Sequence, residues 1–421
     1  MQDQVVRIVV LGAGYAGLLA TTRMAGKLAS EIRMGRVSVT LVNASDVFVE
    51  RLRLHQAAAG RPPVARSIGA ILSGSEVGFV HGAVKALDPD KHAVSIQVET
   101  PAQTRTIEYD ILVYALGSET ALKAIPGVSE HAFALTAAGE RSVSALRTAL
   151  VAQNASPNAG RLLVCGAGPT GIEAAAEFAQ AYPNLRVQLI TRGAFGGFTK
   201  PGIADYMRRS LTKLGVTMTD HTAITAVGPS AATTDQGETV PFDLCLWTGG
   251  FSAPALALEA GLAVNDRGQI VIDPFMRSIS HPDIYAVGDA ASPREKPGAA
   301  VRMAALTAAF MGAHGANCVI AAVKHTRPKP FSFAYVGQAI SLGMSDAIGF
   351  NNFPNDIPHP PYFTGKLGYN MRDFFVRLLA DLPSIERRIP GALQWPGAGR
   401  YTAAQKRSRR GMTTHARQSE S

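Results

Sequence analysis

The sequence predicts an α/β protein built from two copies of one domain plan, and three observations carry this prediction. A strand, a glycine-rich turn, a helix and a second strand follow one another near the N-terminus, and the same succession begins again at residue 161. A strand-rich stretch follows each occurrence, as expected for an internal repeat on the scale of a domain. Hydrophobic residues form 47% of the 421 residues and charged residues 17%, which excludes a largely disordered chain and allows two or three domains.

The first unit has a βαβ layout. Residues 5–11 form an apolar run typical of a buried parallel strand, and GAGYAG follows at 12–17. A helical pattern then covers 15–30, and a second strand is expected at 37–42. This succession predicts two parallel strands joined by a crossover helix.

The second unit repeats the layout, with strands expected at 161–165 and 186–191, GAGPTG at 166–171 and a helix at about 170–181. In each motif the first glycine permits a tight turn, the second lets the backbone approach a pyrophosphate, and the third lets the helix pack closely on the strand. Because the N-terminus of that helix attracts phosphate, the sequence predicts two Rossmann-like dinucleotide-binding domains. The glycines are Gly12, Gly14 and Gly17 in the first motif and Gly166, Gly168 and Gly171 in the second.

Each domain is expected to carry a small antiparallel β-meander insert. Each insert ends in an apolar run that closes with glycine, DILVYALG at 110–117 and DLCLWTG at 243–249. The predicted strands lie at 77–85, 93–99 and 104–109 in the first insert, and at 216–220, 223–227 and one further short run in the second.

A third motif follows the second domain. The run DIYAVGDA at 283–290 is a short strand that ends in a Gly-Asp turn. Asp289 would accept a hydrogen bond from a ribityl or ribose hydroxyl, and it would also serve as a cap for the next helix.

The C-terminal part is less regular. Residues 304–323 contain no charged residue and are long enough to span a bilayer, but the stretch is rich in alanine and glycine, so a buried core helix is preferred. A β-hairpin is expected at 331–344 and a loop at 351–365. Apolar residues at helical spacing predict an amphipathic helix at 365–382, and the last twenty residues are expected to be disordered.

The net charge of +9 is concentrated at the C-terminus, because eight cationic and two acidic residues lie in 385–421. The basic balance is thus a property of the tail and does not indicate a nucleic-acid-binding domain. The chain shows no signal-peptide pattern, which predicts a cytoplasmic protein. Three cysteines without a CxxC pair predict neither a disulfide scaffold nor a zinc site, and no metal site is expected.

Five marks in this order resemble the flavoproteins with two dinucleotide-binding domains, over about residues 5–350. The closest subgroup is that of the type II NADH dehydrogenases (NADH:quinone oxidoreductases) and their actinobacterial FAD-dependent relatives. The marks are GAGYAG at 12–17, YALGS at 114–118, GAGPTGIE at 166–173, LWTGG at 246–250 and YAVGDAA at 285–291.

The resemblance implies a site and a reaction. The first fingerprint and Asp289 would bind FAD, the second fingerprint would bind NAD(P)H, and Gly117 and Gly249 of the two shorter marks are taken as cofactor-binding residues with them. Glu173 matches a glutamate that lies near the nicotinamide in the family, although a carboxylate in the first turn of a helix also favours the helix dipole. The implied enzyme is an NAD(P)H dehydrogenase that passes a hydride to FAD and electrons to a second acceptor, with a quinone as the leading candidate.

Several residues depart from the family pattern. Asn43 replaces the carboxylate that usually accepts from a ribose; it would still hydrogen-bond a ribose hydroxyl of the cofactor, without the charge. The equivalent position in the second domain offers Thr191 and Arg192. Arg192 would pair with a 2′-phosphate and favour NADPH, or it is an exposed arginine at a strand end. The segment 302–308 lacks the glutamines that accompany quinone reduction in the family, which leaves the acceptor open. Arg51 is a candidate for stabilising negative charge on a reduced flavin, whereas His55 is assigned to a solvated helix face.

These features give four segments and three competing functions. The FAD-binding domain is predicted at 1–150 and 265–350, the NAD(P)H-binding domain at 151–264, a loop and amphipathic helix at 351–384, and a basic tail at 385–421. Residues 365–421 would lie on an anionic membrane surface, which would place the protein on the inner face of the cell membrane, and a second copy of the chain is another candidate partner. The alternatives to a quinone reductase are a reductase for a protein electron carrier or a biosynthetic intermediate, and an FAD- and NAD(P)H-binding sensor without turnover.

Overall fold

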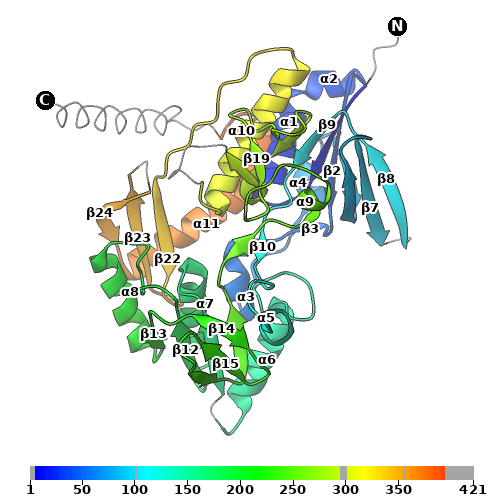
Figure 1. Cartoon of the computed structure of the whole chain (residues 1–421). Helices are drawn as coiled ribbons and strands as arrows, with labels where there is room; N and C mark the ends of the chain where they lie inside the picture. Colours follow the sequence, from blue (N-terminus) through cyan, green and yellow to red (C-terminus); the bar gives the residue numbers. More distant parts are fainter. Residues whose placement is uncertain (1–4, 100–101, 159, 294–300, 354–355, 394–421) are drawn as a thin grey trace, which may run out of the picture.

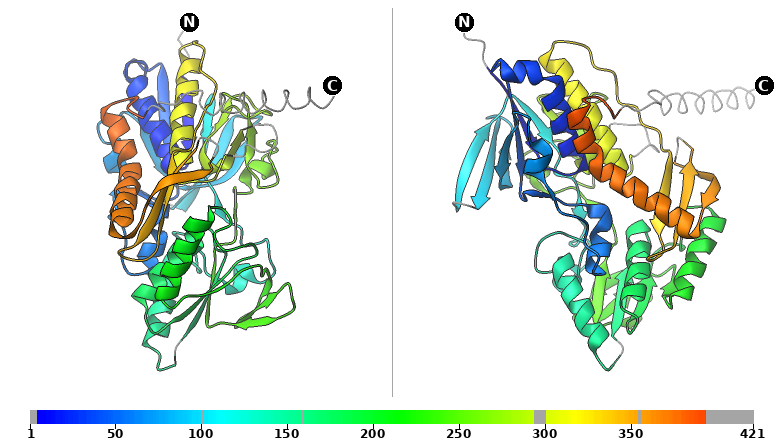
Figure 2. Two further views of the ribbon diagram at one scale, coloured as in Figure 1. Left: turned by 90° about the vertical axis from the view of Figure 1, so that its left-hand side faces the viewer. Right: turned by 180° about the vertical axis from the view of Figure 1, so that it is seen from behind.

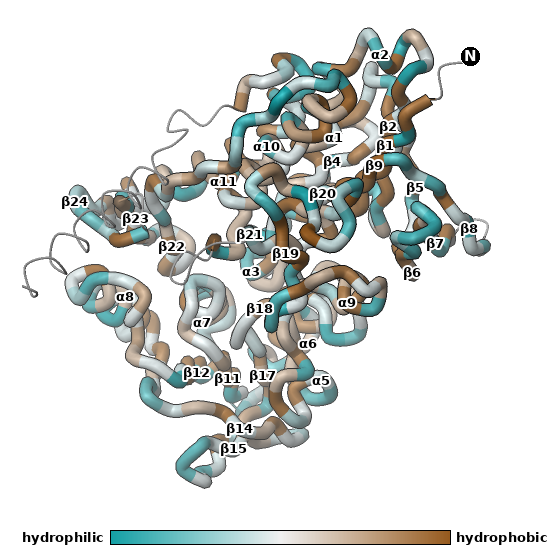
Figure 3. Tube along the Cα trace, turned by 45° about the horizontal axis from the view of Figure 1, so that its top comes forward, coloured by the Kyte–Doolittle hydropathy of each residue, from teal (hydrophilic) through white to brown (hydrophobic). Residues whose placement is uncertain are grey.

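Two parallel sheets, one in each half of the protein, form the framework of the computed structural model (Figure 1). The structure describes residues 5–99, 102–158, 160–293, 301–353 and 356–393. A two-stranded antiparallel ribbon, β10 (Glu119–Thr120) with β18 (Phe251–Ser252), lies where the chain passes between the halves. Figure 3 shows hydrophobic segments along β1 and β9 of the first sheet, whose residues are buried in the largest core cluster.

The first sheet has the order β20-β9-β1-β2-β5, and all its strands are parallel. Strand β1 lies in the centre because Leu11 is paired with Val42 on one side and Tyr114 on the other. The carboxyl ends of β1 and β9 therefore meet at one edge of the sheet, where the first fingerprint begins. The strands are β1 (Val6–Leu11), β2 (Val37–Asn43), β5 (Gly78–His81), β9 (Ile111–Tyr114) and β20 (Ile284–Ala286).

Three long helices lie side by side in the first half (Figure 2), α1 (Tyr15–Lys27), α10 (Ala305–Val323) and α11 (Gly365–Arg388). The meander packs against the same core through Leu87, Val94 and Ile96. Its strands are β6 (Ala83–Asp88), β7 (Ala93–Glu99) and β8 (Ala102–Glu108). The smaller elements of this half are α2 (Ala29–Arg33), β3 (Val47–Phe48), η1 (Arg51–Arg53), α3 (Leu54–Ala58), β4 (Arg66–Ser67), α4 (Ile68–Leu72), α9 (Leu256–Glu259), β19 (Ile270–Ile272), η2 (Gly288–Ala290) and β21 (Ala291–Pro293).

The second sheet has the order β13-β12-β11-β17 and is also parallel. Its central strand β11 pairs Cys165 with Ile190 and Trp247, so the second fingerprint begins at the equivalent edge. The strands are β11 (Arg161–Cys165), β12 (Arg186–Ile190), β13 (Thr217–Thr219) and β17 (Leu244–Trp247). Around them lie α5 (Val128–His131), α6 (Val143–Ala155), α7 (Pro169–Ala181), α8 (Pro201–Lys213) and the meander β14 (Ile224–Val227), β15 (Ala231–Thr234) and β16 (Thr239–Pro241).

Both predicted meanders start one strand too early. Residues 78–81 form β5, which pairs with β2 in the parallel sheet, and residues 217–219 form β13, which pairs with β12. A short apolar run has the same period of two in a parallel edge strand and in a hairpin, so the sequence pattern does not separate the two cases.

The C-terminal sheet also differs from the prediction. Its strands are β22 (Gly337–Ser341), β23 (Ala347–Asn352) and β24 (Pro358–Phe363), whereas a hairpin was expected at 331–344 and a loop at 351–365. Strand β24 contains three prolines and lies at the edge of the sheet, where missing N–H donors are tolerated. The prolines therefore explain both the strand's position and the wrong prediction.

In the described part of the chain one helix, α10, is long and apolar enough to cross a membrane, judged by length and composition alone. In the structure 61% of its apolar window is buried, and it packs along α1. The burial of α10 agrees with the core helix that was predicted at 304–323.

Helix α11 is longer than predicted. Its largest apolar residues face outwards, whereas a surface helix usually buries them. Helix α11 continues to Arg388, and Glu386 is fully buried, so residues 385–393 belong to the folded part and not to the expected basic tail. The reason is an ion pair between Glu386 and Arg23 of α1, 2.7 Å long and almost without solvent exposure. The remainder of that predicted tail, 394–421, lies outside the described residues.

The inner face of α11 is small or charged, with Gly368, Arg372 and Val376 among its buried residues. Its largest apolar residues point outwards. The exposed fractions are 63% for Leu367, 61% for Phe374, 51% for Phe375 and 36% for Leu378, and these four residues are called the outer face of α11 below.

The packing also bears on the predicted domain boundary at residue 150. Leu146 and Leu150 of α6 lie in the core cluster of the second sheet, because α6 packs beside α3 and not on the first sheet. Phe133 forms an isolated bridge with Leu246 in the second half. The chain therefore enters the second domain before residue 150.

Candidate active site

The first fingerprint has two glycines that are fixed by packing and one that faces open space. A Cβ on Gly12, whose φ is +94°, would lie 2.5 Å from the carbonyl oxygen of Ala115, and one on Gly17 would lie 1.8 Å from that of Gly12. A Cβ on Gly14 would have no atom of the described residues within 4 Å apart from its chain neighbours, although this residue precedes the first turn of α1. The fold thus keeps a free approach to the N-terminus of α1, which is the place where a pyrophosphate fits.

The second fingerprint reproduces this arrangement. A Cβ on Gly166 (φ +109°) would lie 2.9 Å from Thr248 Oγ1, and one on Gly171 would lie 1.8 Å from the carbonyl oxygen of Gly166. Gly168, which precedes α7, again has nothing within 4 Å. Gly249 contacts the same turn, because its backbone nitrogen is 3.2 Å from the Cβ position of Gly166.

The Gly-Asp motif lies beside the first fingerprint. Asp289 Oδ2 accepts a 2.7 Å hydrogen bond from Ser118 Oγ, and Arg51 Nη1 donates a 2.5 Å hydrogen bond to the Ser118 carbonyl oxygen. Gly117 adjoins this group, with its Cβ position 3.8 Å from Arg51 Nη1. Burial raises the pKa of Asp289 above its ordinary value, while Ser118 and Arg51 act against this rise. The structure therefore brings Arg51, Gly117 and Asp289 together through Ser118.

The two ribose candidates behave differently. Asn43 Oδ1 accepts a hydrogen bond of 2.9 Å from the Ala13 N–H, and Nδ2 donates to the Ser45 carbonyl oxygen, so this side chain holds the fingerprint turn itself. Arg192 follows β12, is exposed, and has no ion pair or hydrogen bond with its side chain among the described residues. Arg192 is consequently free to meet a ligand, whereas Asn43 already has partners in the protein.

Glu173 lies in a buried polar network between the two halves. Its Oε1 accepts three hydrogen bonds, one from the Ser341 N–H (3.0 Å) and two from Arg372 of α11 (2.9 and 3.2 Å). Oε2 accepts no hydrogen bond from the described residues and lies 4.0 Å from Nδ1 of His55. The carboxylate is thus anchored by one oxygen, while the other lies near His55.

His55 corrects the sequence-based assignment to a solvated face. It is 2% exposed on the short helix α3, which packs against α6 and α7 of the second half. Burial lowers the pKa of His55 to about 3, and the positive charge of Arg372 adds to this effect. The imidazole is therefore neutral at physiological pH.

A second glutamate of α7 joins the network, and the sequence analysis missed it. Glu177 is fully buried, pairs with Arg61 and accepts a 3.3 Å hydrogen bond from Ser341 Oγ. The available signal was a pair of carboxylates four residues apart in the otherwise apolar segment GIEAAAEFA, because buried carboxylates require cationic partners.

Arg302 occupies the segment in which the expected glutamines are absent. Its guanidinium donates to Gln338 Oε1 and pairs with Asp356 at 3.0 Å, and it lies 5.0 Å from the centre of the Tyr335 ring. The arginine therefore connects the segment before α10 to the C-terminal sheet.

The cysteines lie away from any open surface. Cys165 and Cys245 are buried on adjacent strands with their sulfur atoms 3.9 Å apart, and Cys318 is buried in α10. Contact with Cys245, together with burial, raises the pKa of Cys165, so its reactive thiolate form is disfavoured.

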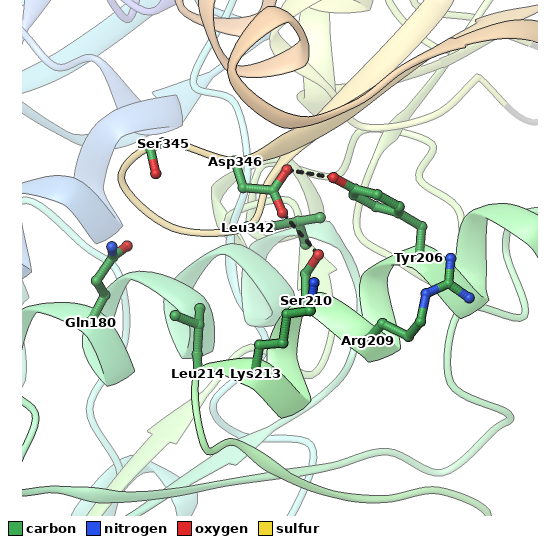
Figure 4. A pocket seen from close by; sticks show the side chains of 9 residues that line it. All are labelled: Gln180, Tyr206, Arg209, Ser210, Lys213, Leu214, Leu342, Ser345 and Asp346. Carbon is green, nitrogen blue, oxygen red and sulfur yellow. Dashed lines mark hydrogen bonds between the residues drawn. The ribbon is translucent and has the colours of Figure 1, made fainter.

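An open hollow of about 170 Å³ lies between α8 and the turn that joins β22 to β23 (Figure 4). Its carboxylate, Asp346, accepts 2.8 Å hydrogen bonds from Tyr206 and Ser210 and a 3.0 Å bond from the Gly365 N–H. Asp346 thus fastens α8 to the start of α11, and the hollow has a structural explanation that is separate from the fingerprints.

A family model described as pyridine nucleotide-disulphide oxidoreductase matches residues 6–313. The chain belongs to this family. A NADH dehydrogenase-like protein of Mycobacterium tuberculosis is 29% identical over 303 residues, which cover 68% of this chain and 73% of the relative. A type II NADH:quinone oxidoreductase of Staphylococcus haemolyticus is 26% identical over 375 residues, which cover 82% of this chain and 89% of the relative.

The structural comparison agrees with the family match. The structure of NDH2 from Plasmodium falciparum has a TM-score of 0.74 to this oxidoreductase at 15% identity, covering 91% of this chain and 97% of the other. The predicted fold class of two Rossmann-like domains, the oxidoreductase class and the resemblance to the type II NADH dehydrogenases are confirmed.

Proposed function

We propose that this oxidoreductase is an FAD-dependent NAD(P)H dehydrogenase with a quinone as its electron acceptor. The observation that supports it most is the duplicated turn in which only Gly14 and Gly168 face open space. Two such turns at two helix N-termini provide for two pyrophosphates, one of a resident FAD and one of a nicotinamide nucleotide. The relatives named above support the quinone, since one of them is a NADH:quinone oxidoreductase.

FAD, when bound, supplies the chemistry that accepts a hydride and delivers two electrons. The protein contributes alignment and electrostatics. The N-terminus of α1 would hold the FAD pyrophosphate, Asp289 would accept from a ribityl hydroxyl, and Arg51, held by Ser118, would stabilise negative charge. Glu173 would present Oε2 to the nicotinamide, because Arg372 fixes the other oxygen.

Anaerobic mixing with NADPH or NADH tests this function. The purified protein should show a flavin spectrum that bleaches within the mixing experiment, and addition of a quinone should restore the colour. A protein that binds flavin but is bleached by neither nucleotide would instead favour the sensor without turnover.

We propose further that Arg192 directs the enzyme towards NADPH. Its guanidinium has no partner among the described residues, and neither Thr191 nor Arg192 offers the carboxylate that would select an unphosphorylated ribose. Replacing Arg192 by alanine should raise the KM for NADPH about tenfold, the effect of one charge-assisted contact, and should leave the KM for NADH nearly unchanged. Arg209→Ala, which removes an exposed arginine of the same domain, is the control, and an equal change for both nucleotides would contradict the proposal.

We also propose that the outer face of α11 attaches the enzyme to an anionic membrane. Four large apolar side chains are exposed there, Arg377 lies beside them, and the cationic residues after 385 would add attraction of about 1 kcal/mol for each one near the surface. Phe374→Ser with Phe375→Ser should reduce sedimentation with vesicles containing anionic lipid without unfolding the protein. The matching control is Val151→Ser, since Val151 is a single exposed apolar residue of α6.

The basic tail is tested separately by a chain that ends after Leu393, because an end at the predicted boundary of residue 384 would remove the buried Glu386, whose carboxylate also accepts a hydrogen bond from the Leu393 N–H. Sedimentation equal to that of the full chain would assign the attachment to α11 alone. A lower molecular mass of the double variant in solution, with unchanged sedimentation, would instead assign the outer face to a second copy of the chain.

A further inference from the structure

The buried network around His55 is balanced in charge as long as the imidazole is neutral. Glu173 and Glu177 of α7 contribute two negative charges, and Arg372 of α11 and Arg61 contribute two positive charges. Arg53 of η1 also acts on His55, but it is paired with Glu50 and Asp373. The helix α6, which packs against α3, adds Arg147 near Gly60. A proton on His55 would thus add an unbalanced positive charge to a nearly dry site.

The geometry around His55 nevertheless allows its imidazole to bind a proton. Nε2 is buried and has no hydrogen-bond partner among the described residues, and Nδ1 lies 4.0 Å from Glu173 Oε2, the oxygen that Arg372 and Ser341 leave free. A movement of about 1 Å would close this gap to a charge-assisted hydrogen bond. The side chain of Glu173 retains 12% exposure, which connects the network to solvent.

The proposed reaction requires one proton that the nucleotide does not carry. A quinone becomes a quinol by gaining two electrons and two protons, whereas NAD(P)H gives up two electrons and one proton as a hydride. The balance is NAD(P)H + quinone + H⁺ → NAD(P)⁺ + quinol, so the second proton comes from solvent. During the reaction the site gains negative charge before the acceptor is protonated, and this charge must be balanced by the protein or by a proton.

We propose that His55 takes up this solvent proton when the site gains negative charge and releases it when the acceptor is protonated. His55 is thereby a proton-holding residue that acts together with Glu173, and the proposal rests on the proposed function. Negative charge gained by the site favours the protonated imidazole and acts against the burial that lowers the pKa of His55. Proton uptake by His55 should therefore increase as the pH falls.

His314 provides a matched control within the same chain. It is also a mostly buried histidine with a buried Nε2 that has no partner among the described residues, and burial lowers its pKa to about 4. It lies on α10 beside Phe331, 5.4 Å between ring centres, and the charged group that acts on it most is Arg23 and not a carboxylate. His314→Gln therefore removes a buried histidine without altering the network.

The test measures protons and not turnover. The FAD-loaded enzyme, its His55→Gln variant and its His314→Gln variant are reduced anaerobically with NADPH in weakly buffered solution containing a pH indicator. The reduced flavin itself also binds protons from solvent, so the quantity compared is the difference between variants. The wild type and His314→Gln should take up more protons per flavin than His55→Gln, and this difference should increase as the pH falls. Equal uptake by His55→Gln and the wild type would overturn the proposal.

A second measurement separates this proposal from the proposed function. Photochemical reduction supplies electrons without a nucleotide, so the difference in proton uptake between wild type and His55→Gln is measurable even if NAD(P)H fails to bleach the flavin. Where His55→Gln loses flavin, the wild type with ¹⁵N-labelled histidine decides. One imidazole should change from the neutral to the protonated nitrogen shift on reduction, and a reduced enzyme in which every histidine keeps its shift would overturn the proposal.

Discussion

Replacing Gly168 by valine should abolish reduction of the flavin by nicotinamide nucleotide while the protein stays folded and keeps its FAD. The Cβ position of Gly168 meets no protein atom within 4 Å, so the side chain is accommodated by the fold, but it fills the space before α7 in which the pyrophosphate would lie. Loss of those contacts, about 3 kcal/mol, corresponds to at least a hundredfold weaker binding. Anaerobic stopped-flow reduction, the flavin spectrum and the melting temperature give the three readouts.

Two other glycines of the same domain serve as comparisons for the Gly168 variant. Gly202, near the start of α8, likewise has no neighbour within 4 Å, so Gly202→Val should leave reduction unchanged. In Gly171→Ala the new Cβ would lie 1.8 Å from the Gly166 carbonyl oxygen, so this variant should lose folded protein as well as activity. Reduction of Gly168→Val at the wild-type rate would remove the second fingerprint from the nucleotide site.

Replacing Glu386 by alanine should lower the free energy of unfolding by about 3–5 kcal/mol, the loss found when one partner of a buried ion pair is removed. Arg23 is 2% and Glu386 0% exposed, and Glu386 also accepts hydrogen bonds from the N–H groups of Gly391 and Leu393. The alanine variant would leave the guanidinium of Arg23 buried without a counter-charge. Denaturant unfolding measures the change.

Helix α11 also provides the control for the Glu386 prediction, and the pKa of Glu386 gives its pH dependence. Asp381→Ala removes one of the two acidic partners of Arg66 and leaves Glu50, and Asp381 is 47% exposed, so its loss should lower stability by no more than about 1 kcal/mol. Burial alone would raise the pKa of Glu386, yet Arg23 and the two N–H groups hold it below its ordinary 4.5. A lowered pKa stabilises the folded state above pH 4.5 and loses this contribution as the pH falls below it. The deficit of Glu386→Ala should therefore shrink in acid, and a deficit independent of pH would contradict the ion-pair explanation.

Much of the fold followed from local patterns. The strands that flank the fingerprints and the helix of each βαβ unit were predicted because apolar runs and special glycines are local in sequence. The starts of the meanders and the C-terminal sheet were not, since pairing partners decide whether a short run such as residues 78–81 extends a parallel sheet. Strand β24 was missed because its prolines are typical of a loop, and only its edge position makes them compatible with a strand.

Some residues of the candidate site could likewise be predicted from sequence, and others could not. Gly12, Gly14, Gly17 and their counterparts could be singled out from sequence, because their spacing between a strand and a helix is local, although Gly12 and Gly166 pack against the distant Ala115 and Thr248. The partners of Glu173 could not, since Arg372 is 199 residues further along the chain and His55 comes from the other domain. A buried histidine and an exposed one have the same sequence pattern, and the distinction arises only when α3 packs against α7.

The reversed faces of α11 make its two sides respond in opposite ways to ionic strength. The inner side is held by ion pairs of Asp373 with Arg53 and of Asp381 with Arg66, which are partly open to solvent and weaken as salt screens them. The outer face consists of phenylalanine and leucine, and salting-out ions strengthen its association with any apolar surface. Concentrated sulfate would thus weaken these two partly exposed pairs and strengthen apolar association of the outer face, while the buried pair of Glu386 with Arg23 would still hold the helix against the protein.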